Sequence, residues 1–452
     1  MVFFGLLSIN CGKHGIEVTM NVKKQFSRIL AILFIIAITG CSAQEDQRSQ
    51  PTTPFVNSST STNIVSSSTP IQKITATSKQ IPSPDPTNTI EFEFPPASEE
   101  IHINADGTGD YTDIYSAVEA AKPGAAIFLS AGRYRLAKKM LVIQKSIQLI
   151  GEGMDSTEIY YDGFETGFIG VAGPSLVSFG GEGGEDPFLI EGITFQNYTS
   201  QSTNVVSAYE SIYVNECRFI GGRMLTTDGV IYVQGDGLQI EDGIVRNSEA
   251  FNNEGVGIFV SFNKSSALNN NLCNNNKVGI EFWDANGTID GNQCNNNKVA
   301  GIVLLENSNA ALTNNLLTGN GGYGAGIMGT STGSVTRNTF TNNKSGLYLA
   351  ENADLLIFGN ELSQNTYGMV FTDDSTGTVE NNSLESNEIG IVVMKKAHPT
   401  INENTLSNNS SYGIYFIDNS FGFATANKCF NNKANIQIEG NADPTIDNKS
   451  CP

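Results

Sequence analysis

The chain has 452 residues, of which 39% are hydrophobic and 16% charged, a composition that allows a packed core and argues against disorder throughout. Gly is abundant, with 46 residues, and Trp occurs once, which favours short strands and turns over long helices. The formal net charge of −20 disfavours nucleic acid and anionic lipid head groups as partners, because both require attraction to phosphate. It also disfavours polyuronate ligands unless cations bridge the like charges.

Residues 21–41 have the layout of a secretory signal, with basic residues before an apolar run that starts at Ile29. The run ends in Ile-Thr-Gly-Cys, which resembles the bacterial lipobox. The resemblance implies cleavage before Cys41 and lipidation of its thiol, so we expect an exported lipoprotein held on a membrane through Cys41. An uncleaved transmembrane anchor is the alternative.

The chain divides into three segments by composition. We expect a signal peptide over residues 1–40, with residues 1–19 upstream of a true start at Met20. Residues 41–100 are rich in Ser, Thr and Pro, cannot bury enough apolar surface to order themselves, and are predicted to be a tether. Residues 101–452 are predicted to be the folded domain.

A repeat of about 22 residues runs through the second half of the chain. One motif is a glycine followed by an apolar residue, and the series closes with Asn435. A second motif, Asn-x-(Leu/Cys/Phe)-x-x-Asn, keeps the same spacing. The glycines are Gly257, Gly279, Gly301, Gly326, Gly346, Gly368, Gly390 and Gly413, and the asparagines are Asn271, Asn292, Asn315, Asn338, Asn360, Asn382, Asn404 and Asn427.

Each repeat contains three short apolar clusters with period-two alternation, and nothing between them is long enough for a helix. A unit of three strands and three turns is one coil of a parallel β-solenoid, stacked on its neighbours at about 4.8 Å. We expect the asparagines to bond backbone groups of the turns and to stack from coil to coil. The glycine before each strand is expected to supply a backbone angle that a Cβ would hinder.

Residues 106–135 and 141–153 carry a family resemblance. Their phrases Asp-Gly-Thr-Gly-Asp-Tyr, Gly-x-Tyr and Leu-Ile-Gly look like the amino-terminal coils of pectinesterases and of other pectin-lyase-like β-helix proteins. The resemblance implies an all-β, single-stranded right-handed parallel β-helix with three strands per coil, and a short capping helix within residues 111–124. The Asn/Gly coils resemble carbohydrate-binding and sugar-hydrolase repeats, and also the β-helix protein of nitrous-oxide-reductase maturation.

Few residues suit catalysis. The domain has only His102 and His398, which disfavours a histidine base or a multi-histidine metal site. The catalytic motifs of pectinesterases have no counterpart after the amino-terminal coils. The adjacent carboxyl groups of Asp373 and Asp374 could share a proton for acid–base work, or they are a solvated turn.

Alignment on the repeat glycine predicts an exposed apolar and aromatic stripe at the second residue after it. The only Trp, Trp283, lies beside this stripe. We expect Phe259, Trp283, Tyr348 and Tyr415 to bind ligand by stacking on sugar rings, and an inert strand surface is the alternative. The stripe comprises Phe259, Glu281, Val303, Met328, Tyr348, Val370, Val392 and Tyr415.

The fifth residue after the glycine is mostly acidic. Stacked carboxylates about 5 Å apart repel one another, which is a physical motive for a bridging Ca²⁺ ion. We expect Ca²⁺ at Asp284, Glu306, Glu351, Asp373 and Asp418, and a solvated turn is the alternative. The full row is Asp284, Glu306, Ser331, Glu351, Asp373, Lys395 and Asp418.

Four cysteines, Cys217, Cys273, Cys294 and Cys429, each follow an asparagine by two residues, a position predicted to point inward. Cys429 and Cys451 lie one coil apart, so an exported protein could join them by a disulfide, or they stay an unpaired ladder.

The leading prediction is an exported, monomeric β-helix lipoprotein that binds polysaccharide without catalysis. The first alternative is a polysaccharide lyase or glycoside hydrolase with an acidic, Ca²⁺-dependent site. The second is an accessory protein with protein partners, like the maturation β-helix protein. Nucleic acid is not expected as a partner.

Overall fold

Residues 95–452 form one compact unit in the computed structural model. The predicted signal, the lipidated Cys41 and nearly all of the predicted tether lie outside the described residues. Within the described part, no helix is long and apolar enough to span a membrane. The structure describes residues 94–137, 139–163, 175–180, 187–227, 230–262, 265–447 and 449–451.

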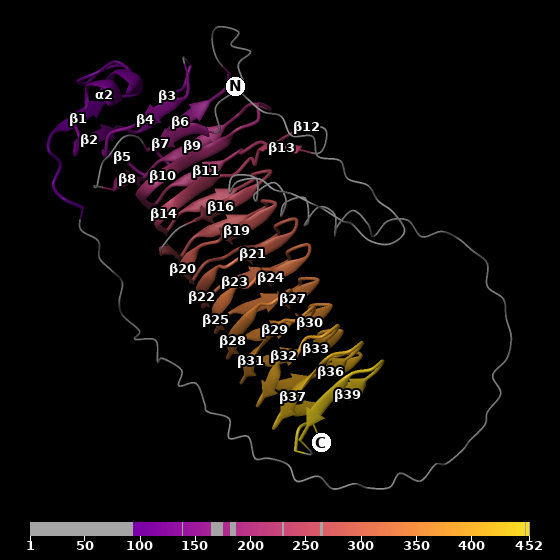
Figure 1. Cartoon of the computed structure of the whole chain (residues 1–452). Coiled ribbons are helices and arrows are strands. Elements are labelled where there is room, and N and C mark those ends of the chain that lie inside the picture. Colours follow the sequence, from indigo (N-terminus) through magenta and orange to yellow (C-terminus); the bar gives the residue numbers. More distant parts are fainter. Residues whose placement is uncertain are drawn as a thin grey trace, which may run out of the picture. The chain divides into compact units, whose positions relative to one another are not determined.

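The unit is a stack of about 14 coils, each built from strands that pair in parallel with those of the coils before and after. Figure 1 shows the coils following one another along the sequence. Three sheets line the stack, so the predicted single-stranded right-handed parallel β-helix is confirmed.

The three sheets, named here the first, second and third sheet, follow the order of strands within a coil. The first sheet comprises β4 (Leu141–Ile143), β7 (Ser175–Phe179), β16 (Val256–Ser261), β19 (Val278–Trp283), β21 (Ala300–Leu305), β24 (Tyr323–Ile327), β27 (Ser345–Leu349), β30 (Tyr367–Phe371), β33 (Ile389–Val393), β36 (Tyr412–Phe416) and β39 (Ala434–Ile438). The second comprises β1 (Glu100–Ile103), β2 (Ala126–Leu129), β5 (Gln148–Gly151), β8 (Phe188–Glu191), β17 (Ser266–Asn269), β20 (Asn286–Asp290), β22 (Asn309–Thr313), β25 (Thr332–Thr336), β28 (Asp354–Phe358), β31 (Thr376–Glu380), β34 (Thr400–Asn402), β37 (Phe421–Thr425) and β40 (Asp443–Ile446). The third comprises β3 (Gly132–Arg135), β6 (Thr157–Tyr161), β9 (Thr194–Asn197), β11 (Arg218–Ile220), β15 (Glu249–Phe251), β18 (Leu272–Asn274), β23 (Leu316–Thr318), β26 (Thr339–Thr341), β29 (Glu361–Ser363), β32 (Ser383–Glu385), β35 (Thr405–Ser407) and β38 (Lys428–Phe430).

Three features depart from this regular pattern. The long strands β10 (Asn204–Asn215) and β14 (Leu238–Arg246) turn a corner and belong to both the first and the second sheet. An antiparallel hairpin, β12 (Leu225–Thr227) and β13 (Val230–Val233), is inserted between them. The third sheet is interrupted at Gln293, which pairs through single bridges only.

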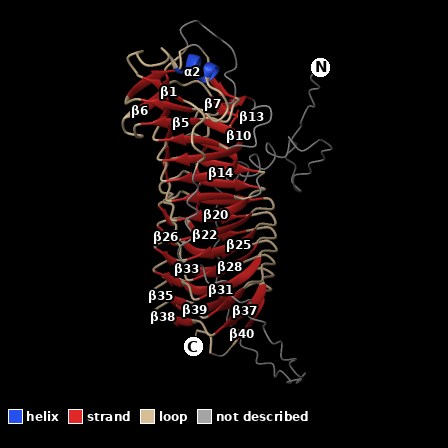
Figure 2. Ribbon diagram, turned by 90° about the vertical axis from the view of Figure 1, so that its left-hand side faces the viewer, coloured by secondary structure: helices blue, strands red, loops and turns tan. Residues whose placement is uncertain are grey.

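The predicted capping helix is confirmed as α2 (Ile114–Ala120), which lies at one end of the stack (Figure 2). Asp113 begins it by accepting a hydrogen bond from the backbone N–H of Ser116 at 2.8 Å, as an N-cap does. Ile114 and Ala117 are buried and join the apolar core. Because the helix places apolar side chains over the first coil, it covers core that no preceding coil covers.

Two buried asparagine ladders hold the turns together on either side of the third sheet, as predicted. At Asn338, the side-chain N–H groups donate to the backbone oxygen of Leu312 (2.9 Å) and to Oδ1 of Asn360 (3.0 Å). The same Oδ1 accepts the backbone N–H of Asn338 at 2.8 Å. Each rung therefore satisfies backbone groups that would otherwise be buried without partners. One ladder comprises Asn271, Asn292, Asn315, Asn338, Asn360, Asn382, Asn404 and Asn427, and the other comprises Asn253, Asn276, Asn297, Asn320, Asn343, Asn365, Asn387, Asn409 and Asn432.

The repeat glycines do not serve the purpose predicted for them. Gly301 does not have a positive φ, so the expectation of a special backbone angle is wrong. A Cβ at Gly301 would lie 2.7 Å from the backbone oxygen of Gly324 and 3.0 Å from Nδ2 of Asn320. Glycine is required because the neighbouring coil approaches too closely for any side chain. In the last described coil the position is held by Asn435, whose backbone oxygen lies where a Cβ on Gly413 would point, at 2.5 Å.

The alignment of the coils on their repeat glycine is wrong in one coil. Strand β24 pairs with β27 so that Ala325 faces Leu347 and Gly326 faces Tyr348. Gly324 is therefore the repeat glycine there, and Gly326 is an outward position. Because Gly324 and Gly326 are only two residues apart, the sequence allowed either one to be the repeat glycine. Only the pairing of β24 with β27 shows that it is Gly324. Met328 and Ser331 consequently drop out of the stripe and the acidic row, and Gly326 and Gly329 take their places.

Candidate functional site

Five tyrosines gather on the outer side of the first sheet, on strands β24, β27, β30 and β36. We call this surface the tyrosine face. All five are partly buried. They occupy two outward columns, one directly before the repeat glycine and one two residues after it. The tyrosine face comprises Tyr323, Tyr348, Tyr367, Tyr412 and Tyr415.

The tyrosines pack around a small apolar cluster that is separate from the core. Val370, Ile389 and Val392 are 4%, 7% and 2% exposed, and partly buried tyrosines lie against them. The ring centroids of Tyr323 and Tyr348 lie 4.5 Å apart, and the ring planes differ by 19°. This distance is close to the spacing between one coil and the next. Since these two rings cover one another's faces, this pair offers a ligand ring edges and hydroxyl groups, whereas the rings of Tyr412 and Tyr415 are tilted by 39° to one another.

The hydroxyls of Tyr348 and Tyr415 are held in their neutral, proton-donating form. Burial raises the pKa of Tyr348, and the nearby Tyr323 adds to the effect. Burial also raises the pKa of Tyr415 to about 12, aided by the hydrogen bond that its hydroxyl donates to Oε2 of Glu439 at 2.7 Å. At neutral pH both groups are hydrogen-bond donors.

The structure brings together only part of the predicted ligand-binding set. Tyr348 and Tyr415 lie on the tyrosine face, whereas Phe259 and Trp283 are each only 1% exposed, so the prediction of an exposed aromatic stripe is wrong for them. Both point away from the core, but in-register neighbours flank them one coil away, and Trp283 lies between Ser261 and Leu305. Outward orientation in a tightly stacked sheet therefore does not ensure exposure.

Sequence reasoning missed three members of the tyrosine face. Tyr323, Tyr367 and Tyr412 each come directly before a repeat glycine, at a position that the alignment did not consider. The signal was present as the dipeptide Tyr-Gly, which recurs in step with the repeat.

A row of acidic residues, called the acidic row, borders the tyrosine face at the turn after the first sheet. These residues adopt left-handed backbone conformations, with φ of 61° at Glu306, 60° at Glu351 and 65° at Asp418. Their carboxylates contact the adjoining coils: Glu351 accepts the backbone N–H of Gly329 at 2.7 Å, and Asp418 accepts that of Lys395 at 3.2 Å. The acidic row comprises Asp284, Glu306, Glu351, Asp373 and Asp418, with Gly329 and Lys395 filling the other coils.

The described structure does not bring three residues of the acidic row together as a metal-binding group, so Ca²⁺ binding by the row stays a prediction. No group of three or more His, Cys, Asp or Glu side chains in the described part of the chain is arranged to hold a metal ion. Each coil supplies one carboxylate at most, and several of these already accept hydrogen bonds. Glu351 and Asp418 accept from backbone amides, Asp284 accepts from Nδ2 of Asn307 at 3.2 Å, and Asp373 accepts from Nζ of Lys395 at 2.7 Å. Asp374 is exposed beside this ion pair, and the described residues show no hydrogen bond between the carboxyl groups of Asp373 and Asp374.

The cysteines serve structure. A disulfide joins Cys429 to Cys451 across the last described coils. Cys273 and Cys294 are free and buried inside the stack, and burial raises the pKa of Cys294 with its neighbour Cys273 adding to the effect. Cys217 is also free and buried, with its pKa raised to about 12 by burial. Such thiols stay protonated and unreactive.

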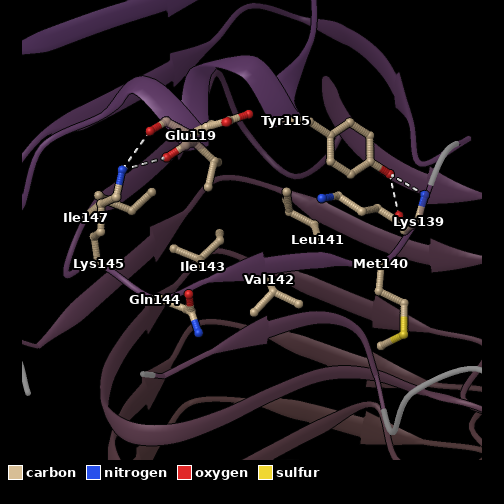
Figure 3. Close-up of a pocket in the computed structure, with 11 residues that line it drawn as sticks. Tyr115, Glu119, Lys139, Met140, Leu141, Val142, Ile143, Gln144, Lys145 and Ile147 are labelled. Atoms are coloured by element: carbon tan, nitrogen blue, oxygen red, sulfur yellow. Dashed lines mark hydrogen bonds between the residues drawn. The ribbon is translucent and has the colours of Figure 1, made fainter. Parts of the chain in front are cut away.

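A cavity of about 340 Å³ lies between α2 and β4, away from the tyrosine face (Figure 3). Its polar groups are already engaged, because Nζ of Lys145 donates to the backbone oxygens of Glu119 and Ala121, both at 2.7 Å. The hydroxyl of Tyr115 likewise bonds the backbone oxygen of Lys139. The cavity thus shows how Lys145 closes the end of α2. Its lining comprises Tyr115, Val118, Glu119, Lys139, Met140, Leu141, Val142, Ile143, Gln144, Lys145 and Ile147.

Comparison with known families agrees with the coil geometry. The family described as "Right handed beta helix region" matches residues 331–451, and the family described as "Periplasmic copper-binding protein (NosD)" matches residues 196–388. The chain is a right-handed parallel β-helix protein. Among curated proteins, none matches this β-helix chain.

Solved structures similar to this β-helix include two enzymes of polysaccharides and a phage protein. The A-module of mannuronan C-5 epimerase AlgE4 from Azotobacter vinelandii is 16% identical, with a TM-score of 0.50, covering 74% of this chain and 93% of the module. The catalytic unit of the GH87 α-1,3-glucanase from Streptomyces thermodiastaticus strain HF3-3 is 14% identical, with a TM-score of 0.50 and coverage of 77% and 69%. The pre-mature gene product 12 of bacteriophage phi29 is 10% identical, with a TM-score of 0.52 and coverage of 77% and 57%. Identities this low establish the shared fold alone.

Proposed function

We propose that this β-helix is an exported lipoprotein that binds a polysaccharide chain along the tyrosine face, without transforming it. The observation behind this proposal is that five partly buried tyrosines gather on four of five consecutive coils of one sheet. Ring edges and neutral hydroxyls suit a pyranose polymer, which has both apolar C–H faces and hydroxyl groups. Since the coils repeat at about 4.8 Å, an extended polymer lying along the sheet would meet similar contacts repeatedly.

Two further considerations support the proposal. Two of the similar solved structures are named for action on polysaccharides, the mannuronan epimerase and the α-1,3-glucanase. A family named as periplasmic matches the central coils, which supports an exported location with the lipid anchor at Cys41. Copper binding is not part of the proposal, because the described residues supply no cluster of donors that fits a copper ion.

The test is a binding titration of the full protein against a panel of neutral, amine-bearing and uronate oligosaccharides. The double variant Tyr348→Ala/Tyr415→Ala is expected to weaken binding of the recognised sugar about tenfold or more, since aromatic contacts contribute on the order of 1 kcal/mol each. The matched control is Phe423→Ala, which removes a half-exposed aromatic side chain from the second sheet.

Binding that survives the tyrosine substitutions, or that falls equally in the Phe423→Ala control, contradicts the proposal. Release of shortened or unsaturated products from the same panel would instead favour a hydrolase or lyase.

A further inference from the structure

The acidic row borders the tyrosine face along its length. Each carboxylate lies just after a first-sheet strand, and Glu351, Asp373 and Asp418 follow β27, β30 and β36, the strands that carry four of the five tyrosines. The charges of Asp373 and Glu351 contribute to raising the pKa of Tyr348. Glu351 and Asp418 are exposed, and each uses one carboxylate oxygen to accept a backbone N–H of the adjoining coil.

The row lacks positive charge along much of its course. Burial raises the pKa of Glu306, and the like charges of Glu351 and Asp284 raise it further. The carboxylates therefore repel one another, and the whole chain carries a formal net charge of −20. A cationic group bound at the row would lower this electrostatic repulsion.

One coil already shows how an ammonium group fits. Lys395 occupies the row position between Asp373 and Asp418, and its Nζ lies 2.7 Å from Oδ1 of Asp373. An ammonium group is therefore accommodated in the row one coil away from a carboxylate, on a surface that remains partly open to solvent.

We propose that the polymer bound on the tyrosine face is an amino-sugar polysaccharide with free, protonated amines. Its ammonium groups pair with Glu351 and Asp418 as Lys395 pairs with Asp373, while its pyranose rings lie against the tyrosines. The inference rests on the proposed function and adds the charge of the ligand. A polyuronate would meet repulsion from the row, and a neutral glycan would leave the carboxylates uncompensated.

The test compares three hexasaccharides by calorimetry at low and moderate salt: β-1,4-linked glucosamine, its fully N-acetylated form, and an oligouronate. The glucosamine form is expected to bind at least tenfold more tightly than the N-acetylated form, with the difference shrinking as salt rises. The oligouronate is expected not to bind.

The variant Glu351→Gln/Asp418→Asn is expected to abolish the preference for free amines, so that the amine-bearing and N-acetylated forms bind it with similar affinity. Glu361→Gln, on the exposed side of the third sheet, is the matched control and is expected to change neither affinity.

The outcomes separate the two proposals. Equal binding of the amine-bearing and N-acetylated forms overturns this inference and leaves polysaccharide binding intact. Binding of none of the three contradicts the proposed function itself. Hexalysine, added as a fourth probe, overturns the inference if it binds more tightly than the glucosamine hexamer, because the row would then select a basic peptide.

Discussion

Close backbone approach decides which residues the coils tolerate. A Cβ on Gly324 would lie 2.6 Å from the backbone oxygen of Gly346 and 2.7 Å from a ring carbon of Phe340. Two residues later, a Cβ on Gly326 would meet only side-chain atoms of Tyr323 and Met328, at 3.1 and 3.6 Å. The two glycines look alike in sequence but differ in what surrounds them.

We expect Gly324→Ala to lower the free energy of unfolding by about 1 to 3 kcal/mol, the usual cost of forcing extra atoms into a packed interior. Gly326→Ala is expected to lower the free energy of unfolding by much less than Gly324→Ala, because the side chains near Gly326 can move aside whereas the backbone near Gly324 cannot. Urea unfolding of both variants measures the difference. Equal losses would contradict the strand register that makes Gly324 the repeat glycine.

At the scale of single elements, each coil depends on its neighbours. In the middle of the stack the inward residues are fully buried by the coils on both sides, whereas in β39 and β40 the inward residues Ile436 and Ile446 are only partly buried. The disulfide between Cys429 and Cys451 ties these last described coils together across 22 residues of chain. Because stability in a stacked repeat is largely local, this tie acts mainly on the strands beside it.

Reduction of the Cys429–Cys451 disulfide is therefore expected to loosen β38, β39 and β40, with a local loss on the order of 3 kcal/mol for a loop of this length. Hydrogen exchange followed by mass spectrometry should show faster exchange in residues 428–447 and little change in the central coils. In Cys429→Ser/Cys451→Ser, the reductant should have no further effect. A uniform increase over the whole stack would show that the coils unfold together instead.

At the scale of the whole molecule, the repeat that stacks the coils also stacks their charges. The left-handed turn after the first sheet recurs in each coil from β16 to β39, so the acidic side chains placed there face one another along the stack. Lys395 relieves the repulsion locally at Asp373, whereas Glu306 has like charges as neighbours. The row is thus a property of the assembly of coils that no single coil possesses.

We expect Glu306→Gln to stabilise the protein at neutral pH. The folded pKa of Glu306 is raised by burial and by its acidic neighbours, so the folded state loses stability as pH rises from the unfolded pKa through the folded one. The gain in the variant should be present at pH 7 and should vanish below the ordinary carboxyl range, where the residue is protonated in both states. Thermal unfolding across pH 3 to 7 tests this, with Glu361→Gln as control, and a gain that persists at pH 3 would refute the electrostatic cause.

The sequence by itself determined the architecture. Two motifs with a common period of about 22 residues predicted the coil, its three strands and the ladders, because a repeated turn needs the same hydrogen-bonding side chain at the same place in every coil. The inward position of Cys273 follows from the same local pattern, whereas the capping helix around Ile114 was implied by the resemblance of residues 106–135 to pectin-lyase-like β-helix proteins.

The tertiary structure alone decided what the outer surface presents. Periodicity predicts that Phe259 and Trp283 point away from the core, yet both are buried, because exposure depends on what adjoining segments place over a side chain. Only the pairing of β24 with β27 separated Gly324 from Gly326. Likewise, only the stacking of coils gathered tyrosines from separate repeats into one face and set Lys395 against Asp373. Local sequence fixes the direction of a side chain, whereas its neighbours come from coils some 22 residues away.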